Sequence, residues 1–187
     1  MRYCYNCFQA MPDGAAVCPS CGYNASSQTD KYPMALPPGT VLNGRYILGR
    51  VLGQGGFGIT YIAQDHKTGS LVAVKEYFPD TMAARTDGHS VSAYTGQREE
   101  NFLYGKECFL NEAKTLAEFI GNPNIVRVHS YFEENNTAYF VMDYVQGTSF
   151  QDYLKQHGRP SWPETKRILE PVIGALASVH SKGVIHR

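Results

Sequence analysis

The segment LGQGGFGITY, residues 52–61, decides how this chain must fold. On either side lie RYILGRVL (45–52) and GITYIAQD (58–65), whose β-branched and aromatic residues are typical of strands. Glycines at this spacing let backbone N–H groups approach phosphate oxygens, because no Cβ stands in the way. A dinucleotide-binding fold uses the same spacing but continues into a helix, whereas residues 59–62 favour a strand. We therefore predict a glycine-rich hairpin that covers phosphates, since a merely flexible hairpin would not need four glycines in six residues.

The third predicted strand, LVAVKEYF (71–78), contains a lysine that suits the same ligand. Neighbouring side chains in a strand alternate between two faces, so Ala73 and Lys75 share one face while Val72 and Val74 share the other. A small residue followed two positions later by an ammonium suits a flat base on Ala73 with its phosphates near Lys75. A lone lysine at a strand end is usually only solvated, so this interpretation requires an acidic partner.

The acidic partner is predicted on KECFLNEAKTLAEFI (106–120), which has helical spacing of its apolar residues. These residues are Phe109, Ala113, Leu116 and Ile120. Glu112 lies three positions after Phe109 and four before Leu116, so we expect it on the inward stripe. An unpaired buried charge is costly, which makes Lys75 its predicted partner. Spacing alone leaves open that Glu112 lies at the edge of the stripe and is solvated.

Four of the five cysteines form two C-x-x-C pairs within the first 21 residues. They are Cys4, Cys7, Cys18 and Cys21. Two such turns complete a tetrahedral set of thiolates for Zn²⁺, and a site with four protein ligands is structural because catalysis needs an open position. A haem site would need a histidine where Phe8 and Gly22 stand, a redox C-x-x-C rarely occurs twice so close, and disulfides are disfavoured in the cytosol. The fifth, Cys108, is interpreted as an ordinary thiol.

Composition divides the chain into a cysteine module (1–24), a linker rich in serine and proline (25–39) and a folded domain (40–187). Lysine plus arginine equal aspartate plus glutamate at 17 each, so no overall field recruits nucleic acid or an anionic membrane. No apolar run approaches the roughly 18 residues of a spanning helix, and the first residues do not resemble a signal peptide. We therefore expect a cytoplasmic protein without a membrane segment in this chain and without a nucleic-acid partner.

Six segments, taken in order, resemble a known family. They are LGQGGFGITY, VAVK, NEAKTL, NPNIVRVHSYF, YFVMDYVQGTSFQDYL and GVIHR. Together they closely resemble the eukaryotic-type protein kinases, particularly the bacterial serine/threonine kinases, over residues 45–187. The resemblance implies an α+β fold in which a five-stranded antiparallel sheet and an αC helix form the N-lobe (40–145), followed by the first helices of the C-lobe (146–187). Several bacterial kinases carry a zinc-ribbon-like module, which the N-terminus also resembles.

The resemblance implies an ATP site and names its residues. Lys75 and Glu112 are the catalytic ion pair, with Lys75 on the phosphates. Met142 corresponds to the gatekeeper of the hinge, and the Asp143 carbonyl and the Val145 N–H are expected to hydrogen bond adenine. The full set of nucleotide-contacting residues implied is Leu52, Gly53, Gly55, Gly56, Phe57, Gly58, Thr60, Ala73, Lys75, Met142, Asp143 and Val145.

Two departures from the family pattern are visible. Thr60 stands where the family usually has valine, and we expect its hydroxyl to be tolerated. About 30 residues separate Lys75 from the predicted helix, including the polar stretch ARTDGHSVSAYTGQREE (84–100). Of two interpretations, a contact for a partner and a surface loop, we favour the loop, because long surface connections cost little entropy.

The last motif, GVIHR (183–187), resembles the start of the kinase catalytic loop, H-R-D-x-x-x-x-N. The aspartate, and the Mg²⁺ ligands of the family, would come after Arg187. The first hypothesis is therefore a piece of a serine/threonine kinase that transfers the γ-phosphoryl of MgATP to protein substrates. The alternative is a non-catalytic zinc-bearing module for nucleotide binding or protein interaction. The two surfaces expected to allow dimerisation are the N-lobe and the apolar helix expected over 162–183. A partner or dimer mate that covers this helix would support the alternative.

Overall fold

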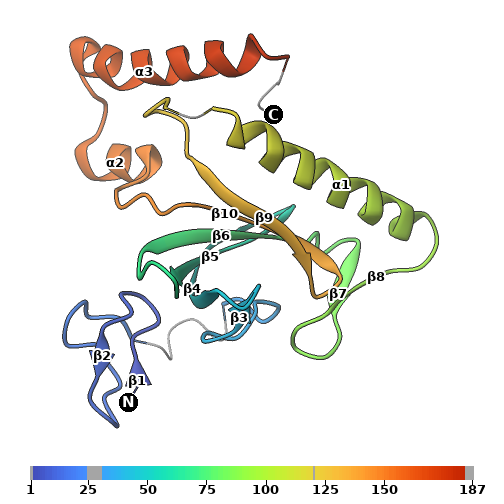
Figure 1. The fold of residues 1–187 in the computed structure, drawn as a ribbon. Coiled ribbons are helices and arrows are strands. Elements are labelled where there is room, and N and C mark those ends of the chain that lie inside the picture. The colour runs from blue at the N-terminus through green and yellow to red at the C-terminus, as the bar shows by residue number, and fades with distance from the viewer. Residues whose placement is uncertain (1, 25–30, 120, 184–187) are drawn as a thin grey trace. The chain divides into compact units, whose positions relative to one another are not determined.

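The computed structural model describes residues 2–24, 31–119 and 121–183 of the chain (Figure 1). These residues divide into two compact units. The first comprises the described residues within Met1–Glu118 and Arg127–Tyr144, and the second comprises those within Phe119–Val126 and Val145–Arg187.

The first unit contains a six-stranded antiparallel sheet with the order β3-β4-β5-β6-β10-β9 (Figure 1). The strands are β3 (Val41–Leu42), β4 (Tyr46–Gly55), β5 (Gly58–Asp65), β6 (Leu71–Tyr77), β9 (Val128–Glu134) and β10 (Thr137–Asp143). Five of them are the strands of the predicted N-lobe sheet, and the two-residue β3 is added at one edge. Asn135 and Asn136 form the β9–β10 turn, and both have positive φ (52° and 60°). A two-residue type I′ hairpin turn requires positive φ at both of its central residues.

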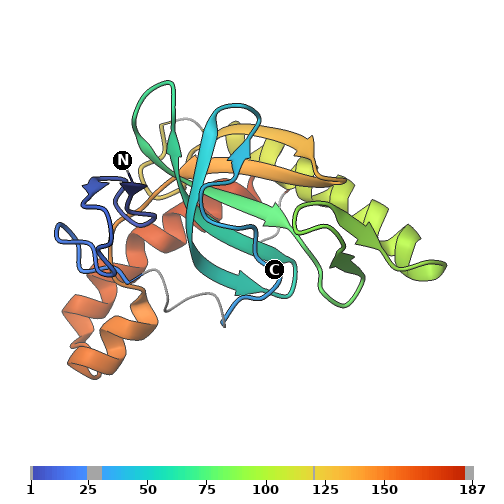
Figure 2. The ribbon, with the colours of Figure 1, turned by 90° about the horizontal axis from the view of Figure 1, so that it is seen from below.

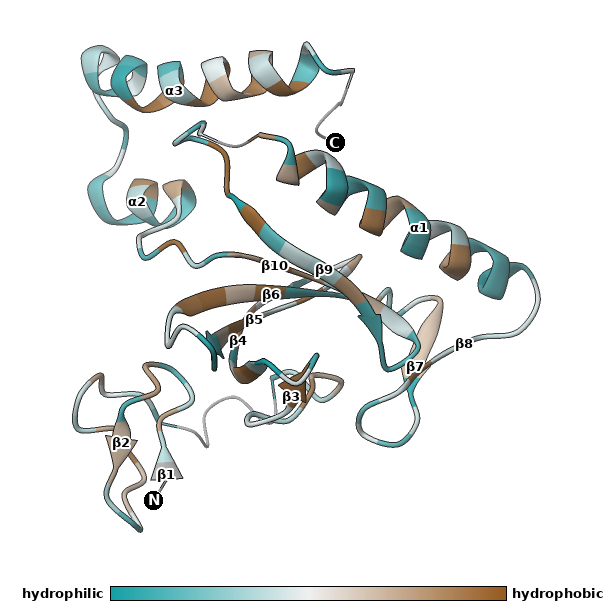
Figure 3. Ribbon diagram, in the orientation of Figure 1, coloured by the Kyte–Doolittle hydropathy of each residue, from teal (hydrophilic) through white to brown (hydrophobic). Residues whose placement is uncertain are grey.

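Helix α1 (Gln97–Ala117) packs against β9 and β10 through one apolar face. In Figure 3 its ribbon alternates between brown and teal, as expected for a half-buried helix. The Phe109 ring lies 5.5 Å from the Tyr77 ring and 4.9 Å from the Phe140 ring. The predicted start at residue 106 is wrong, because the helix already includes Phe102, whose ring packs 5.2 Å from Tyr77. The predicted last residue, Ile120, lies outside the described residues.

The polar insertion forms ordered structure, so the prediction of a surface loop is wrong. Strands β7 (Ala83–Arg85) and β8 (Val91–Ala93) pair as an antiparallel hairpin, and α1 begins soon afterwards. Figure 2 shows this hairpin at the same end of the sheet as the start of α1. The sequence of this segment is polar, but the Arg85 side chain is buried because it pairs with Glu76 of β6.

The second half of the predicted linker also packs on the sheet. Leu36 is 2% exposed and its backbone N–H donates to the Tyr61 hydroxyl at 3.0 Å. The Gly39 N–H donates to the Leu48 carbonyl at 2.7 Å. Thus residues 31–39 form part of the folded first unit, while residues 25–30 lie outside the described residues.

The second unit contains α2 (Phe150–His157) and α3 (Trp162–His180). The Ser149 hydroxyl caps α2 by accepting from the Asp152 N–H, and the Tyr153 hydroxyl donates to Glu164 of α3. Several apolar side chains of α3 are exposed within this chain, as expected from its sequence. They include Leu169, Val172 and Ile173. Among the helices of the described residues, none is both long and apolar enough to cross a membrane.

Candidate nucleotide site and candidate metal centre

The register of the sheet places several predicted nucleotide residues in two neighbouring rows on one face. In the first row Thr60 lies opposite Lys75 on β6, and Lys75 lies opposite Phe140 on β10. The second row consists of Ile62, Ala73 and Met142. Because alternate residues of a strand point to the same side, the two rows share one surface. The register of β4 against β5 shifts on both sides of Val51, so the half-buried Leu52 lies at an irregularity of the strand.

The glycines of the hairpin have two different physical roles. A Cβ placed on Gly53, Gly55 or Gly56 would meet no atom within 4 Å, so these positions leave open space above the backbone. A Cβ on Gly58 would lie 1.9 Å from the Glu76 carbonyl oxygen, so this glycine is needed for the close approach of β5 to β6. The tip residue Phe57 is 74% exposed. The first three glycines therefore leave the backbone accessible to a ligand, and the fourth allows the strands to pack.

Lys75 and Glu112 lie close together. The Lys75 Nζ is 3.9 Å from a Glu112 carboxylate oxygen, and it lies over the rings of Phe109 and Phe140 at 5.5 and 5.2 Å. The side chains are 30% and 52% exposed respectively. The expectation that Glu112 lies on the buried stripe is therefore wrong, because α1 buries Phe109 and Ala113 and leaves Glu112 at the rim. An ammonium that is partly open to solvent and held by one carboxylate can accept a phosphate as a second anionic partner.

The predicted hinge residues lie at the end of β10 and beyond it. The Asp143 N–H donates to the Arg127 carbonyl at 3.0 Å, and its carboxylate lies 2.6 Å from His129 Nε2. Met142 is partly buried against the core of the first unit. Val145 belongs to the second unit and is 73% exposed.

A buried polar cluster on the opposite face of β6 was missed by the sequence reasoning. Glu76 is fully buried and accepts hydrogen bonds from the hydroxyls of Tyr61 at 2.7 Å and Tyr139 at 2.9 Å. The Arg85 guanidinium donates to both carboxylate oxygens at 2.9 Å. Burial raises the pKa of both tyrosines, and the neighbouring carboxylate raises it further. The available signal was Glu76 itself, because alternation places it on the same buried face as Val74.

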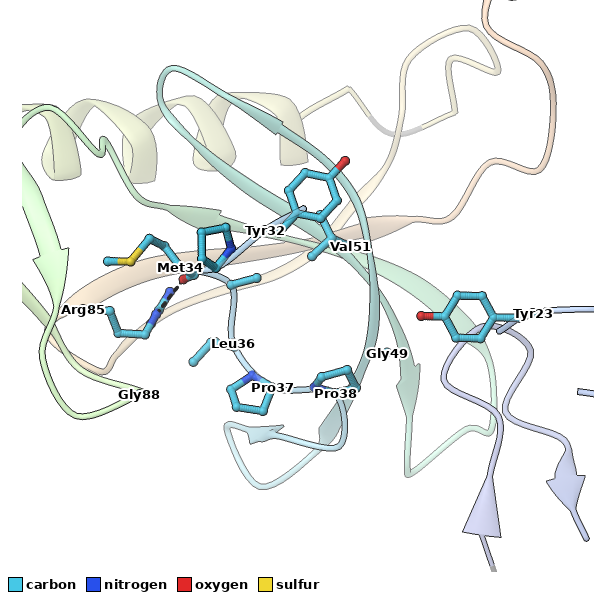
Figure 4. A pocket seen from close by; sticks show the side chains of 12 residues that line it. Tyr23, Tyr32, Met34, Leu36, Pro37, Pro38, Gly49, Val51, Arg85 and Gly88 are labelled. Carbon is cyan, nitrogen blue, oxygen red and sulfur yellow. Dashed lines mark hydrogen bonds between the residues drawn. The ribbon is translucent and has the colours of Figure 1, made fainter. Parts of the chain in front are cut away.

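A cavity of about 370 Å³ lies beside this cluster (Figure 4). It is lined by Tyr23, residues 32–38 and parts of β4, and also by Arg85, which donates to the Met34 carbonyl at 2.8 Å. None of the predicted nucleotide-contacting residues lines it. Because the guanidinium is already paired with Glu76, this cavity offers no free charge to a phosphate.

The four N-terminal cysteines converge on one point. Their sulfur atoms all lie within 4.8 Å of one another. The Cys4 and Cys21 sulfurs are 3.6 Å apart, and the Cys7 and Cys18 sulfurs are 3.7 Å apart. A tetrahedral Zn²⁺ with Zn–S bonds of about 2.3 Å requires sulfur atoms about 3.8 Å apart. The arrangement of donors therefore fits a zinc ion.

Burial and hydrogen bonding act in opposite directions on the thiols of this cluster. Burial raises the pKa of Cys7 to about 12. At Cys21 burial acts in the same direction, but donation from the Asn6 side chain and the Tyr23 backbone outweighs it and lowers the pKa to about 6. The hydrogen bonds to Cys21 thus favour its thiolate, and thiolates are the form that binds a metal.

Comparison with known proteins identifies the family to which the chain belongs. The protein kinase domain family matches residues 46–187. The chain belongs to the protein kinase domain family. Its relatives include serine/threonine-protein kinase B of Synechocystis sp., which is 30% identical over 178 residues that cover 94% of this chain and 26% of the relative. PrkC of Bacillus subtilis, another serine/threonine-protein kinase, is 28% identical over 149 residues, which cover 80% of this chain and 20% of the relative.

Solved structures show the same fold. The apo form of PpkA-294 has a TM-score of 0.75 at 32% identity and covers 82% of this chain and 54% of that chain. The kinase domain of Mycobacterium tuberculosis PknI has a TM-score of 0.60 at 26% identity, covering 82% and 55%. The predicted kinase N-lobe fold is confirmed. The chain spans about a quarter of the curated kinase B and about half of these solved chains.

Proposed function

We propose that this chain is the ATP-binding portion of a serine/threonine protein kinase. The intact kinase would transfer the γ-phosphoryl group of ATP to serine or threonine hydroxyls of protein substrates. The observation that carries the proposal is the Lys75–Glu112 ion pair, which occurs in one compact unit with a β4–β5 hairpin whose first three glycines are open above the backbone. In phosphoryl transfer the protein mainly positions and neutralises the phosphates, and these groups suit that task.

Each proposed nucleotide residue has a physical role. Backbone N–H groups at Gly53, Gly55 and Gly56 hydrogen bond the phosphates, with Phe57 and Gly58 completing the turn. The Lys75 ammonium neutralises phosphate oxygens, and Glu112 holds it in place. Further residues surround adenine: Leu52, Thr60, Ala73 and Met142 pack on the base, while the Asp143 carbonyl and the Val145 N–H hydrogen bond its edge. In the kinase family the catalytic aspartate and the Mg²⁺ ligands follow the motif at 183–187.

The ATP site is tested by replacing Lys75. Lys75→Met should weaken the binding of a non-hydrolysable ATP analogue by about ten- to a hundredfold, since a hydrogen bond to a charged group contributes about 1.5–3 kcal/mol. Lys67→Met is the matched control, because Lys67 is exposed on the β5–β6 turn. Isothermal titration calorimetry in the presence of Mg²⁺ measures both. Equal affinities for the two variants would refute the assignment.

The cysteine cluster is proposed to hold structural Zn²⁺ through Cys4, Cys7, Cys18 and Cys21. The matching sulfur separations support this assignment. A module of this size buries little core, so the metal would supply most of its folding free energy. Thiolate ligands persist in a reducing compartment, which favours a cytoplasmic location. Cys7→Ser should reduce bound zinc from one ion per chain to none by atomic emission, whereas Cys108→Ser should retain it; retention in both would exclude the site.

A further inference from the structure

The two turns of the cysteine module share a backbone conformation but differ at one residue. The residue after the second cysteine of each pair is left-handed, with φ of 71° at Gly22 and 57° at Phe8. Glycine adopts this conformation freely, whereas a side chain with a Cβ disfavours it. The geometry of the turn therefore does not require a phenylalanine. Contacts of the Phe8 side chain outside the turn must offset the cost of its left-handed backbone conformation.

Phe8 is compensated by contacts with the kinase sheet. It is 6% exposed, yet the module's own core consists of other side chains: Cys4, Met11 and Cys18, with Cys7, Ala15 and Tyr23 packed against them. A Cβ placed on Gly49 of β4 would lie 2.9 Å from the Phe8 Cζ and 2.9 Å from the Ile62 Cγ2. The phenyl ring therefore occupies a slot that exists because residue 49 is glycine, and Ile62 forms a second side of that slot.

Polar contacts hold the module at the same place. The Arg50 N–H of β4 donates to the Tyr5 carbonyl oxygen at 2.7 Å, and a Cβ on Gly49 would lie 2.2 Å from that oxygen. The Arg50 Nε donates to the Asn6 side-chain oxygen at 2.6 Å. The amide nitrogen of Asn6 in turn donates to the Cys21 sulfur at 3.5 Å. Asn6 thus connects the metal-site sulfur directly to strand β4.

The docking position is close to the proposed nucleotide site. Gly49 and Arg50 belong to the strand that continues into Gly53 and Gly55 of the hairpin. Ile62 lies directly opposite Ala73, the residue proposed to pack on adenine. Displacing the module would therefore remove a backbone hydrogen bond from β4. It would also expose one side of the row formed by Ile62, Ala73 and Met142.

We propose that the cysteine module docks on the nucleotide-binding lobe and holds β4 in place through Phe8, Tyr5 and Asn6. The affinity of the lobe for ATP then depends on this docking. This inference rests on the proposed ATP site. Docking and metal binding are separable in this arrangement, because Phe8 and Gly49 are not metal ligands. A variant that retains zinc but undocks the module should therefore bind ATP more weakly.

Two substitutions in the zinc-loaded chain test this. Phe8→Gly suits the left-handed turn and removes the whole side chain, including the ring in the slot. Gly49→Ala places a Cβ against the Tyr5 carbonyl oxygen. Gly174→Ala is the control, because its Cβ would meet no atom within 4 Å. Three quantities are measured on each variant: zinc content, hydrogen exchange of the Arg50 amide, and affinity for a non-hydrolysable ATP analogue.

Both docking variants should retain one zinc per chain, lose the protection of the Arg50 amide, and bind the analogue about fivefold or more weakly, the lower end of typical coupling between sites. The control should match the wild type in all three. Wild-type protection of the Arg50 amide in both variants would refute docking. Lost protection with unchanged ATP affinity would refute the coupling. A wild-type chain that binds no ATP analogue would refute the proposed function and the coupling with it, while Arg50 exchange would still report docking.

Discussion

The buried Glu76–Arg85 pair allows a quantitative prediction about the stability of the lobe. The two side chains are 0% and 4% exposed, and the guanidinium contacts both carboxylate oxygens. Arg85→Met would leave a buried carboxylate whose remaining partners, within the described part of the chain, are the hydroxyls of Tyr61 and Tyr139. Breaking a buried pair by removing one member costs about 3–5 kcal/mol. For a chain of this size that corresponds to a fall in Tm of about 6–20 °C.

The same geometry makes a less obvious prediction for a double variant. Glu76→Gln keeps groups that can hydrogen bond both tyrosines but removes the charge. Combined with Arg85→Met, it should unfold at a higher temperature than Arg85→Met alone, although it carries one substitution more. Thermal unfolding followed by circular dichroism measures each variant, with Arg159→Met at an exposed position as the control. The reasoning fails if Arg85→Met changes stability by less than about 1 kcal/mol, or if the double variant is the less stable one.

Three further predictions follow from individual contacts. Glu112→Gln should lower ATP affinity but shift the Tm by less than about 4 °C, because exposed ion pairs contribute less than about 1 kcal/mol; a larger shift in calorimetry would contradict the exposed geometry. Hydrogen bonds from Arg45 hold the pKa of the Asp65 carboxyl well below its usual range. The stabilisation of the folded state by Asp65 is therefore present above the unfolded pKa of about 3.9 and is lost as the pH falls. Asp65→Asn should flatten the fall of Tm between about pH 5 and pH 3, and a fall of Tm as steep as in the wild type would exclude this cause. Gly58→Ala should lower the Tm because its Cβ would meet a backbone oxygen of β6 at 1.9 Å, whereas Gly55→Ala should not; equal Tm values would contradict the division of roles within the hairpin.

The sequence predicted those features that depend on neighbours along the chain. The β4–β5 hairpin could be predicted from two local signals. These are the alternation of side chains within each strand and the glycines between segments 45–52 and 58–65. Two C-x-x-C turns were sufficient to predict the cysteine cluster, because each turn orients its own pair. Lys75 was predicted from its place after Ala73, but the exposure of Glu112 was misjudged. Periodicity shows which side of a helix is apolar, but not how far the sheet beneath it extends.

The tertiary structure decided the features that depend on contacts between residues far apart in the sequence. The spacing of residues along the chain gives no signal for such contacts. Residues 84–100 look like a polar loop until Glu76 supplies a buried partner for Arg85. Residues 31–39 have the composition of a linker, but Leu36 is buried and its N–H donates to the Tyr61 hydroxyl. The slot at Gly49 cannot be recognised without Phe8, which lies in another module. Local spacing determines the conformation of a segment, whereas the burial of one particular ring or charge depends on which surfaces meet when the chain folds.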